Sequence, residues 1–132
     1  MIKNLDRLRQ AIDTEDLFEG LRGIKYSGDV DNVTIINDCV FLIEVKFMHC
    51  TQSYPQWSAY HTIAAALQAD GYDVYHVLAW HDDLPPESPI MLRDCIVGYA
   101  AHNGATIQYN SNNPTVKEFI RQVVKREKSV MC

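Results

Sequence analysis

The sequence predicts a mixed α/β fold built around one central sheet. The chain has 132 residues, of which 47% are hydrophobic, so it can bury one core and fits a single domain over residues 1–132. Apolar residues at helical spacing open and close the chain. Runs rich in Val, Ile, Phe and Tyr, broken by turn residues, fill most of the middle. The expected element order is α-β-β-β-α-β-β-β-α.

The N-terminal third predicts a helix, a short strand and a hairpin. Residues 2–21 have apolar positions at helical spacing, and residues 24–26 suit a short strand. The hairpin strands cover residues 30–36 and 39–47, and Asn37-Asp38 forms the turn between them.

The middle of the chain predicts a helix followed by a buried strand. Pro55 suits the first turn of a helix, and Gly71 suits its end. Residues 73–80 have the composition of a buried strand, and the proline-rich stretch 81–89 is typical of a loop.

The C-terminal part predicts a hairpin and a helix. Residues 91–100 and 106–109 are the expected strands, joined by an Asn103-Gly104 turn, and a helix follows Pro114. The apolar stripe of this helix comprises Val116, Phe119, Ile120, Val123 and Val124.

The first hairpin brings charged residues together. With a two-residue turn, Asp31 lies opposite Glu44, and Asp29 lies opposite Lys46, all on one face. Opposed Cβ atoms are about 4.5–5.5 Å apart, so two carboxylates repel each other unless a cation compensates. Such charges are often only a solvated face, but Glu44 and Lys46 lie within an apolar strand, where charge is costly. A longer turn would make Asp29 the first acid instead of Asp31.

Four features follow one another along this region: an acid, a hairpin, an acid-apolar-lysine triplet, and a Gln-x-x-x-Tyr motif at the start of the next helix. The residues are Asp31, Glu44, Val45, Lys46, Gln56 and Tyr60. This order resembles the PD-(D/E)xK nuclease superfamily, in its RecB-type branch. The resemblance implies a single restriction-endonuclease-like domain. Residues 2–80 would form its αβββαβ core with a mixed central sheet, and the C-terminal β-hairpin and helix would be added to that core. Val30 stands where the family often has proline.

The resemblance implies a role for each residue of the motif. Asp31 and Glu44 would bind Mg²⁺ or Mn²⁺, with the Val45 carbonyl oxygen as a further ligand. Lys46 would position or activate the attacking water.

The helical residues of the motif complete the implied site. Gln56 and Tyr60, one turn apart, would face the site and contact DNA or support Lys46. Family members also place a glutamate of the first helix beside the metal, for which Glu19 and Glu15 are both candidates.

The expected function is therefore hydrolysis of DNA phosphodiester bonds, dependent on a divalent metal ion. Phage or mobile-element recombination, repair or DNA processing would suit so small an enzyme, and a homodimer would present two sites to one substrate. The alternative is a catalytically silent nuclease-like fold that binds or inhibits another macromolecule. No apolar run approaches the roughly 18 residues of a membrane helix, and the N-terminus lacks a signal peptide, so a cytoplasmic protein is expected.

Charge is distributed unevenly along the chain. Residues 1–113 contain 7 Lys and Arg against 15 Asp and Glu, a net charge of −8, which favours the binding alternative. Lys117, Arg121 and Lys125 recur every fourth residue near the C-terminus, in a segment of net charge +3. They form either the solvated face of an amphipathic helix or a strip that contacts DNA phosphates.

Overall fold

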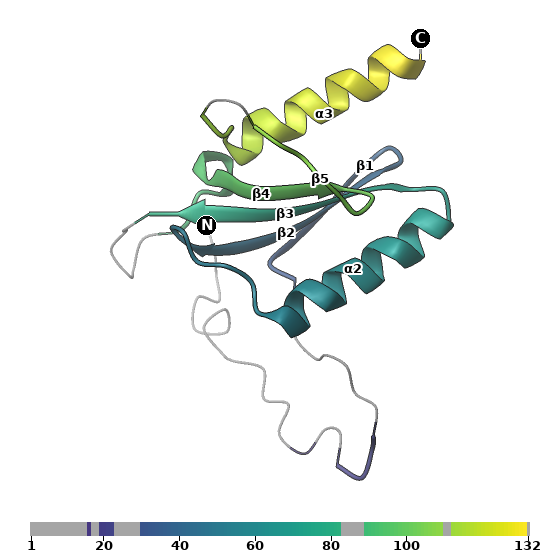
Figure 1. Ribbon diagram of the computed structural model, residues 1–132. Helices are drawn as coiled ribbons and strands as arrows, with labels where there is room; N and C mark the ends of the chain where they lie inside the picture. Colours follow the sequence, from purple (N-terminus) through teal and green to yellow (C-terminus); the bar gives the residue numbers. More distant parts are fainter. Residues whose placement is uncertain (1–15, 17–18, 23–29, 83–88, 110–111, 132) are drawn as a thin grey trace, which may run out of the picture.

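The computed structural model describes residues 16, 19–22, 30–82, 89–109 and 112–131 (Figure 1). Within them the chain forms a five-stranded sheet and two α-helices. The elements in chain order are β1 (Asn32–Ile36), β2 (Cys39–Phe47), α2 (Tyr54–Ala69), β3 (Asp73–His81), the 3₁₀-helix η1 (Leu92–Asp94), β4 (Ile96–His102), β5 (Ala105–Thr106) and α3 (Val116–Met131).

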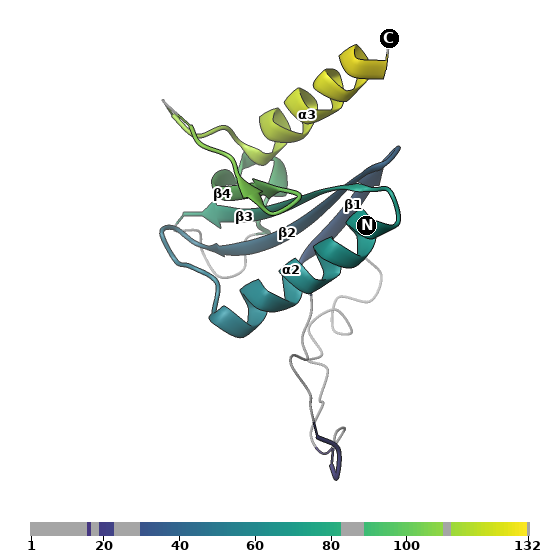
Figure 2. The ribbon, with the colours of Figure 1, turned by 45° about the vertical axis from the view of Figure 1, so that its right-hand side comes forward.

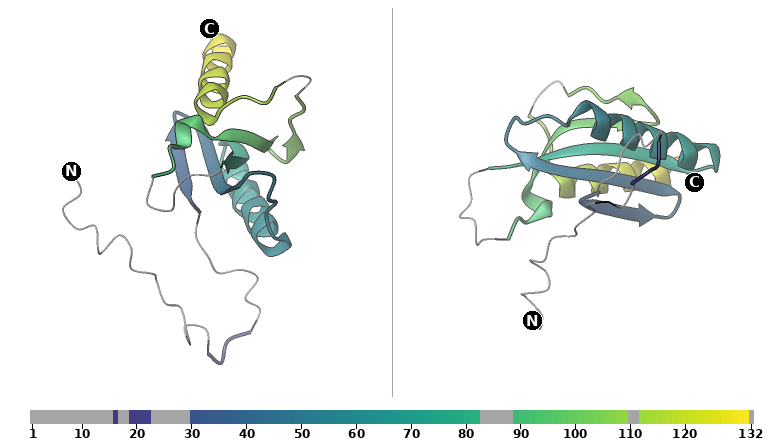
Figure 3. Two further views of the ribbon diagram at one scale, coloured as in Figure 1. Left: turned by 90° about the vertical axis from the view of Figure 1, so that its left-hand side faces the viewer. Right: turned by 90° about the horizontal axis from the view of Figure 1, so that it is seen from below.

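The sheet is mixed, which confirms the predicted α/β class. Its strand order is β1-β2-β3-β4-β5. Strands β2 and β3 are parallel, and the other neighbouring pairs are antiparallel. Helix α2 connects the two parallel strands and covers one face of the sheet, while α3 covers the opposite face (Figures 2 and 3). No helix in the described part of the chain is long and apolar enough to cross a membrane.

The first hairpin has the predicted turn and register. Asn37-Asp38 connects β1 to β2, and Asn37 adopts a φ of 54°, which asparagine tolerates better than most residues. Asn32 pairs with Ile43, so the position opposite Glu44 belongs to Asp31. This register decides the face on which every side chain of β2 lies.

The face covered by α3 is an apolar core. Phe41 of β2 stacks on Tyr75 of β3, with their ring centroids 5.3 Å apart. Phe119 of α3 packs edge-on against both rings. Val116 and Val123 are also buried here, so the apolar stripe predicted for this helix is its buried face.

The face covered by α2 has a smaller apolar cluster. Val40 and Leu42 of β2 and Val74 of β3 pack against Tyr60 and Ala64 of the helix. Because side chains alternate along a strand, the next residues on this face after Leu42 and Val74 are Glu44 and His76. The same face is therefore apolar at one end and polar at the other.

Helix α2 begins and ends as predicted. The Ser53 hydroxyl accepts a hydrogen bond from the Gln56 amide at 3.3 Å, and Pro55 lies in the first turn. At the other end, Gly71 adopts a φ of 96°, a conformation that favours glycine. These signals fix where Gln56 and Tyr60 lie along the helix.

The predicted C-terminal hairpin is shorter than expected. The stretch before β4 is a 3₁₀ turn, in which the Cys95 amide donates to the Leu92 carbonyl at 3.1 Å. Strand β5 covers only two residues because the outer edge of β4 is taken by a later segment. The Val97 amide donates to the Pro114 carbonyl, and the Asn113 side chain donates to the Val97 carbonyl.

The prediction of a helix over residues 2–21 is wrong at the C-terminal end of that range. Residues 19–22 form a turn and irregular chain, and Asp16 and Gly20 adopt φ values of 61° and 80°, which a right-handed helix cannot contain. The rest of that helix, the strand at 24–26 and most of the loop at 81–89 lie outside the described residues.

Candidate functional site

Glu44 is the centre of the candidate site. Its side chain projects from β2 toward α2, and the residue is only 6% exposed. The Tyr60 hydroxyl donates a hydrogen bond to Glu44 Oε2 at 2.6 Å, and Gln56 also hydrogen-bonds this carboxylate. The two helical residues of the predicted motif therefore both hold Glu44.

Lys46 lies two residues farther along the same face. Its Nζ is 3.7 Å from Glu44 Oε1, and one third of its side chain is exposed. The ammonium group thus contacts a buried carboxylate on one side and is accessible from solvent on the other. A lysine in this position can reach a bound anion without leaving its partner.

Asp31 is held beside Glu44 by the backbone of β2. It directly precedes β1, and its Oδ2 accepts a hydrogen bond from the Val45 amide at 2.8 Å. In a continued β1–β2 ladder, a backbone carbonyl of the first strand would accept from the Val45 amide. Here the Asp31 carboxylate accepts instead. An open groove of about 390 Å³ begins here, lined by Asp31, Asn32, Val45, Ile90 and Leu92.

The surroundings of Glu44 raise its pKa. Burial is the largest cause, because it removes water from the ionised carboxylate, and the negative charge of Asp31 acts in the same direction. The hydrogen bonds from Tyr60 and Gln56 and the charge of Lys46 oppose this increase. Ionised Glu44 is therefore under-compensated, and a cation between the two acids would stabilise it.

The donor set suits a hard cation. Asp31 and Glu44 offer carboxylate oxygens, and Mg²⁺ is commonly bound through one or two carboxylates, with water completing its shell. No group of three His, Cys, Asp or Glu side chains gathers for a metal within the described residues. Glu19, one of the two predicted further ligands, lies in the turn at residues 19–20 and belongs to no such group. Glu15 and Asp29 lie outside the described residues.

The predicted phosphate strip is not brought to this site. Lys117, Arg121 and Lys125 are exposed on α3, which covers the face opposite Glu44. These three side chains and the Glu44 carboxylate therefore lie on opposite faces of the sheet.

Sequence reasoning missed His76, which lies on the same face as Glu44 and is 3% exposed. Its Nε2 is 2.8 Å from the side-chain oxygen of Gln52. An amide oxygen only accepts, so Nε2 carries the proton and Nδ1 presents a lone pair. Burial, followed by the nearby His61, lowers the pKa of His76 to about 4. Only the parallel pairing of β2 with β3, which no local pattern encodes, places this ring beneath α2.

Buried polar atoms gather around the start of α2. Among the described residues, four such atoms on this face have no hydrogen-bond partner: Gln52 Nε2, Gln56 Oε1, His61 Nε2 and His76 Nδ1. An unsatisfied buried polar group costs about 1–3 kcal/mol. The polar end of this face therefore has hydrogen-bonding capacity that no contact among the described residues uses.

The chain matches no known family model, no curated protein and no solved structure. The resemblance to nucleases therefore rests on the residues of the motif and on the geometry that brings five of them together: Asp31, Glu44, Lys46, Gln56 and Tyr60.

Proposed function

We propose that the protein is a divalent-metal-dependent nuclease that hydrolyses DNA phosphodiester bonds. The supporting observation is the convergence of the motif on one carboxylate. Residues from the hairpin and from α2, separated by up to 29 positions in sequence, all interact with Glu44 or with the strand that carries it. Chance occurrence of the motif would not require its members to meet in space.

The chain supplies two carboxylates to hold Mg²⁺ or Mn²⁺, namely Asp31 and Glu44. When bound, such an ion polarises a phosphate and lowers the pKa of a coordinated water. The Lys46 ammonium would donate hydrogen bonds to the attacking water and to the phosphate oxygens, on which negative charge increases during attack. Tyr60 and Gln56 hold the Glu44 carboxylate in one orientation, so they act as positioning residues.

The reaction is a hydrolysis. The oxygen of water bonds to phosphorus, the bond from phosphorus to the 3′ oxygen breaks, and a proton passes to that leaving oxygen. The products are a 5′-phosphate and a 3′-hydroxyl. In-line displacement of this kind requires positioning and charge stabilisation, which the three charged residues Asp31, Glu44 and Lys46 can provide.

The proposal includes a restriction-endonuclease-like arrangement of β1, β2, α2 and β3, and a place in phage or mobile-element recombination, repair or DNA processing. It also includes action in the cytoplasm, with a homodimer presenting two sites to one DNA. The competing candidate is a catalytically silent binding protein, which the negative charge of residues 1–113 favours. A binding protein has no need of a buried carboxylate that is costly to ionise.

Cleavage of plasmid, single-stranded and branched DNA, measured with Mg²⁺, with Mn²⁺ and with EDTA, tests the proposal. We expect metal-dependent cleavage that falls at least about a hundredfold in Lys46→Ala and in Asp31→Asn. Asp38→Asn is the matched control, because Asp38 is an exposed aspartate at the other end of the same hairpin. Absence of cleavage of every substrate by the wild-type protein, or wild-type turnover by Lys46→Ala, would refute the assignment and favour the binding protein.

A further inference from the structure

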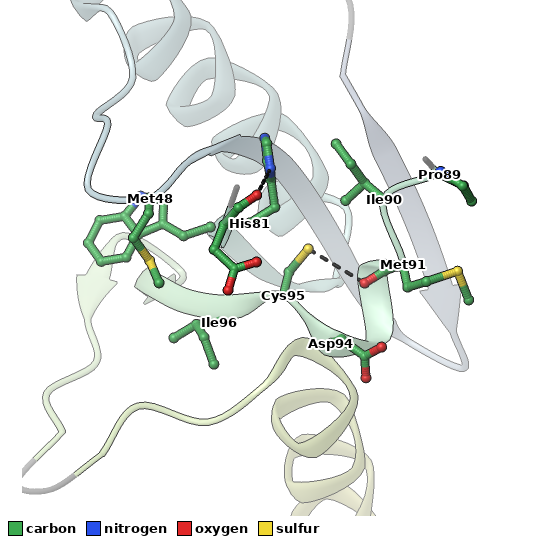
Figure 4. Close-up of a pocket in the computed structure, with 10 residues that line it drawn as sticks. Met48, His81, Pro89, Ile90, Met91, Asp94, Cys95 and Ile96 are labelled. Carbon is green, nitrogen blue, oxygen red and sulfur yellow. Dashed lines mark hydrogen bonds between the residues drawn. The ribbon is translucent and has the colours of Figure 1, made fainter. Parts of the chain in front are cut away.

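A cavity of about 230 Å³ lies where the parallel strands β2 and β3 end (Figure 4). Met48 follows β2, and Trp80 lies next to the last residue of β3. Ile90, Met91 and Ile96 also line the cavity, so most of its wall is apolar. Ligands commonly bind beyond the carboxyl ends of parallel strands, where the connecting segments diverge.

The cavity adjoins the candidate active site. Trp80 is the register partner of Lys46 across the parallel pair, so the two side chains leave neighbouring positions on the same face. Ile90 lines both this cavity and the groove that begins at Asp31. A ligand with a phosphate at Lys46 could therefore place its next group in the cavity.

The indole of Trp80 is a fixed wall. Its Nε1 donates to the Cys50 carbonyl at 2.8 Å, and the ring of His49 lies edge-on with centroids 5.0 Å apart. Gly98 on β4 permits this placement, because a Cβ there would lie 2.4 Å from the indole. Rigid aromatic surfaces of this kind stack on nucleobases.

The polar side chains that line the cavity are His81, Asp82, Asp94 and Cys95. His81 Nδ1 already donates to the Asp82 backbone carbonyl at 3.0 Å, and the two aspartates supply acceptors. Burial raises the pKa of the Cys95 thiol most, and the charges of Asp94 and Asp82 raise it further. Arg93 pairs with Asp94 only at the exposed surface, at 3.7 Å. Among the described residues that line the cavity there is no Lys or Arg. The cavity thus disfavours a phosphate and favours a flat ring that donates N–H groups.

We propose that this cavity binds an unstacked nucleobase that carries an amino group, namely cytosine, adenine or guanine in preference to thymine. The proposal rests on the nuclease function and names its substrate class: DNA in which a base beside the bond to be cleaved is free to leave the stack, as in single strands and frayed ends. Asp82 and Asp94 accept hydrogen bonds from the amino group, which thymine lacks. The same chemistry is present in a free nucleotide, so the test separates the two sources.

The test uses the fluorescence of Trp80. The chain has two tryptophans, so Trp57→Phe leaves Trp80 as the only one. Titrations in EDTA with oligo(dC), oligo(dT), deoxycytidine and thymidine report binding without cleavage. We expect quenching, with oligo(dC) bound about tenfold more tightly than oligo(dT), and much weaker binding of both nucleosides. Asp82→Ala with Asp94→Ala removes both acceptors and should reduce that preference to about twofold or less, whereas Asp70→Ala, at an exposed aspartate, should preserve it.

A second variant, Ile90→Phe, keeps the proposal testable if the double aspartate variant does not fold. Ile90 is 46% exposed, so Ile90→Phe can fill the mouth of the cavity without disturbing the core, and it should remove both the quenching and the preference. Equal binding of the two oligonucleotides, unaffected by Ile90→Phe, would overturn the cavity proposal even if DNA is cleaved. Base preference without any cleavage would support the cavity and refute the nuclease. Deoxycytidine that binds as tightly as oligo(dC) would overturn DNA as the source of the base.

Discussion

The two faces of strands β2 and β3 differ in chemistry, although successive residues of the same strands supply the side chains of both. Toward α3 lie Phe41, Ile43, Tyr75 and Val77, in a core made of apolar side chains. Toward α2 the apolar cluster gives way to charged and polar groups, four of which have buried atoms without described partners. One face is therefore a hydrophobic core, whereas the other combines an apolar cluster with polar and charged groups. The same strands serve both because side chains alternate with a period of two.

The largest expected effect comes from the α3 face. Phe41→Ala removes a fully buried ring that contacts Tyr75 and Phe119, so the free energy of unfolding should fall by about 3–5 kcal/mol. Glu44→Gln, three residues away on the opposite face, should leave the free energy of unfolding unchanged or raise it at pH 7, because burial, the largest cause of the raised pKa of Glu44, opposes its ionised form. Urea unfolding measures both, and similar losses in the two variants would contradict the division of the faces.

The pH dependence of stability tests the polar face directly. The pKa of His76 is about 4 in the folded protein against 6.5 for an ordinary histidine, so the unfolded chain binds more protons between these values. Stability should therefore fall as the pH drops from 6.5 to 4, by up to about 3 kcal/mol. Glu44 acts in the opposite sense: its raised pKa contributes stability below 4.5, and this contribution is lost as the pH rises through the folded value.

His76→Gln separates the two contributions. Unfolding by urea at pH values from 4 to 7.5 should show a flatter profile in this variant than in the wild type, because the titrating ring is absent. Identical profiles would mean that the ring is not buried in its neutral form.

Tyr60→Phe should have a smaller effect, about 1–2 kcal/mol, from loss of the hydrogen bond to Glu44. The same change raises the pKa of Glu44 further, so the acid limb of the pH profile for cleavage should move to higher pH. Tyr54→Phe is the matched control, since Tyr54 is exposed on the same helix. An unmoved limb in Tyr60→Phe would show that Glu44 does not govern the reaction.

The smallest effect on stability is expected for Lys117→Gln, Arg121→Gln and Lys125→Gln combined. These residues are exposed, so the free energy of unfolding should change by less than about 0.5 kcal/mol. If they contact phosphates, the slope of log K against log salt for DNA binding should flatten by about 2–3. An unchanged slope would mean that these three residues of α3 make no contact with DNA phosphates.

The hairpin register and the start of α2 could be predicted from the sequence, because residues close to each other in the chain determine them. Asn37-Asp38 and the alternation around it fixed the register that sets Asp31 against Glu44, and Pro55 fixed the start of the helix that carries Tyr60. The remainder depends on pairing between distant segments. His76 reaches the polar face only through the parallel alignment of β2 and β3, and no sequence period indicated that α3 covers the face opposite the site.

The hydrogen bond from the Val45 amide to Asp31 joins the two chain segments of the first hairpin at its open end, opposite the turn. The turn at Asn37-Asp38 is about 17 Å away along a five-residue strand. Residues inserted within that turn would lengthen the loop while leaving the paired strands in register. The turn is therefore a point at which a fluorophore or an affinity peptide can be attached. The attached group would project beyond the end of the sheet that is remote from the carboxylates.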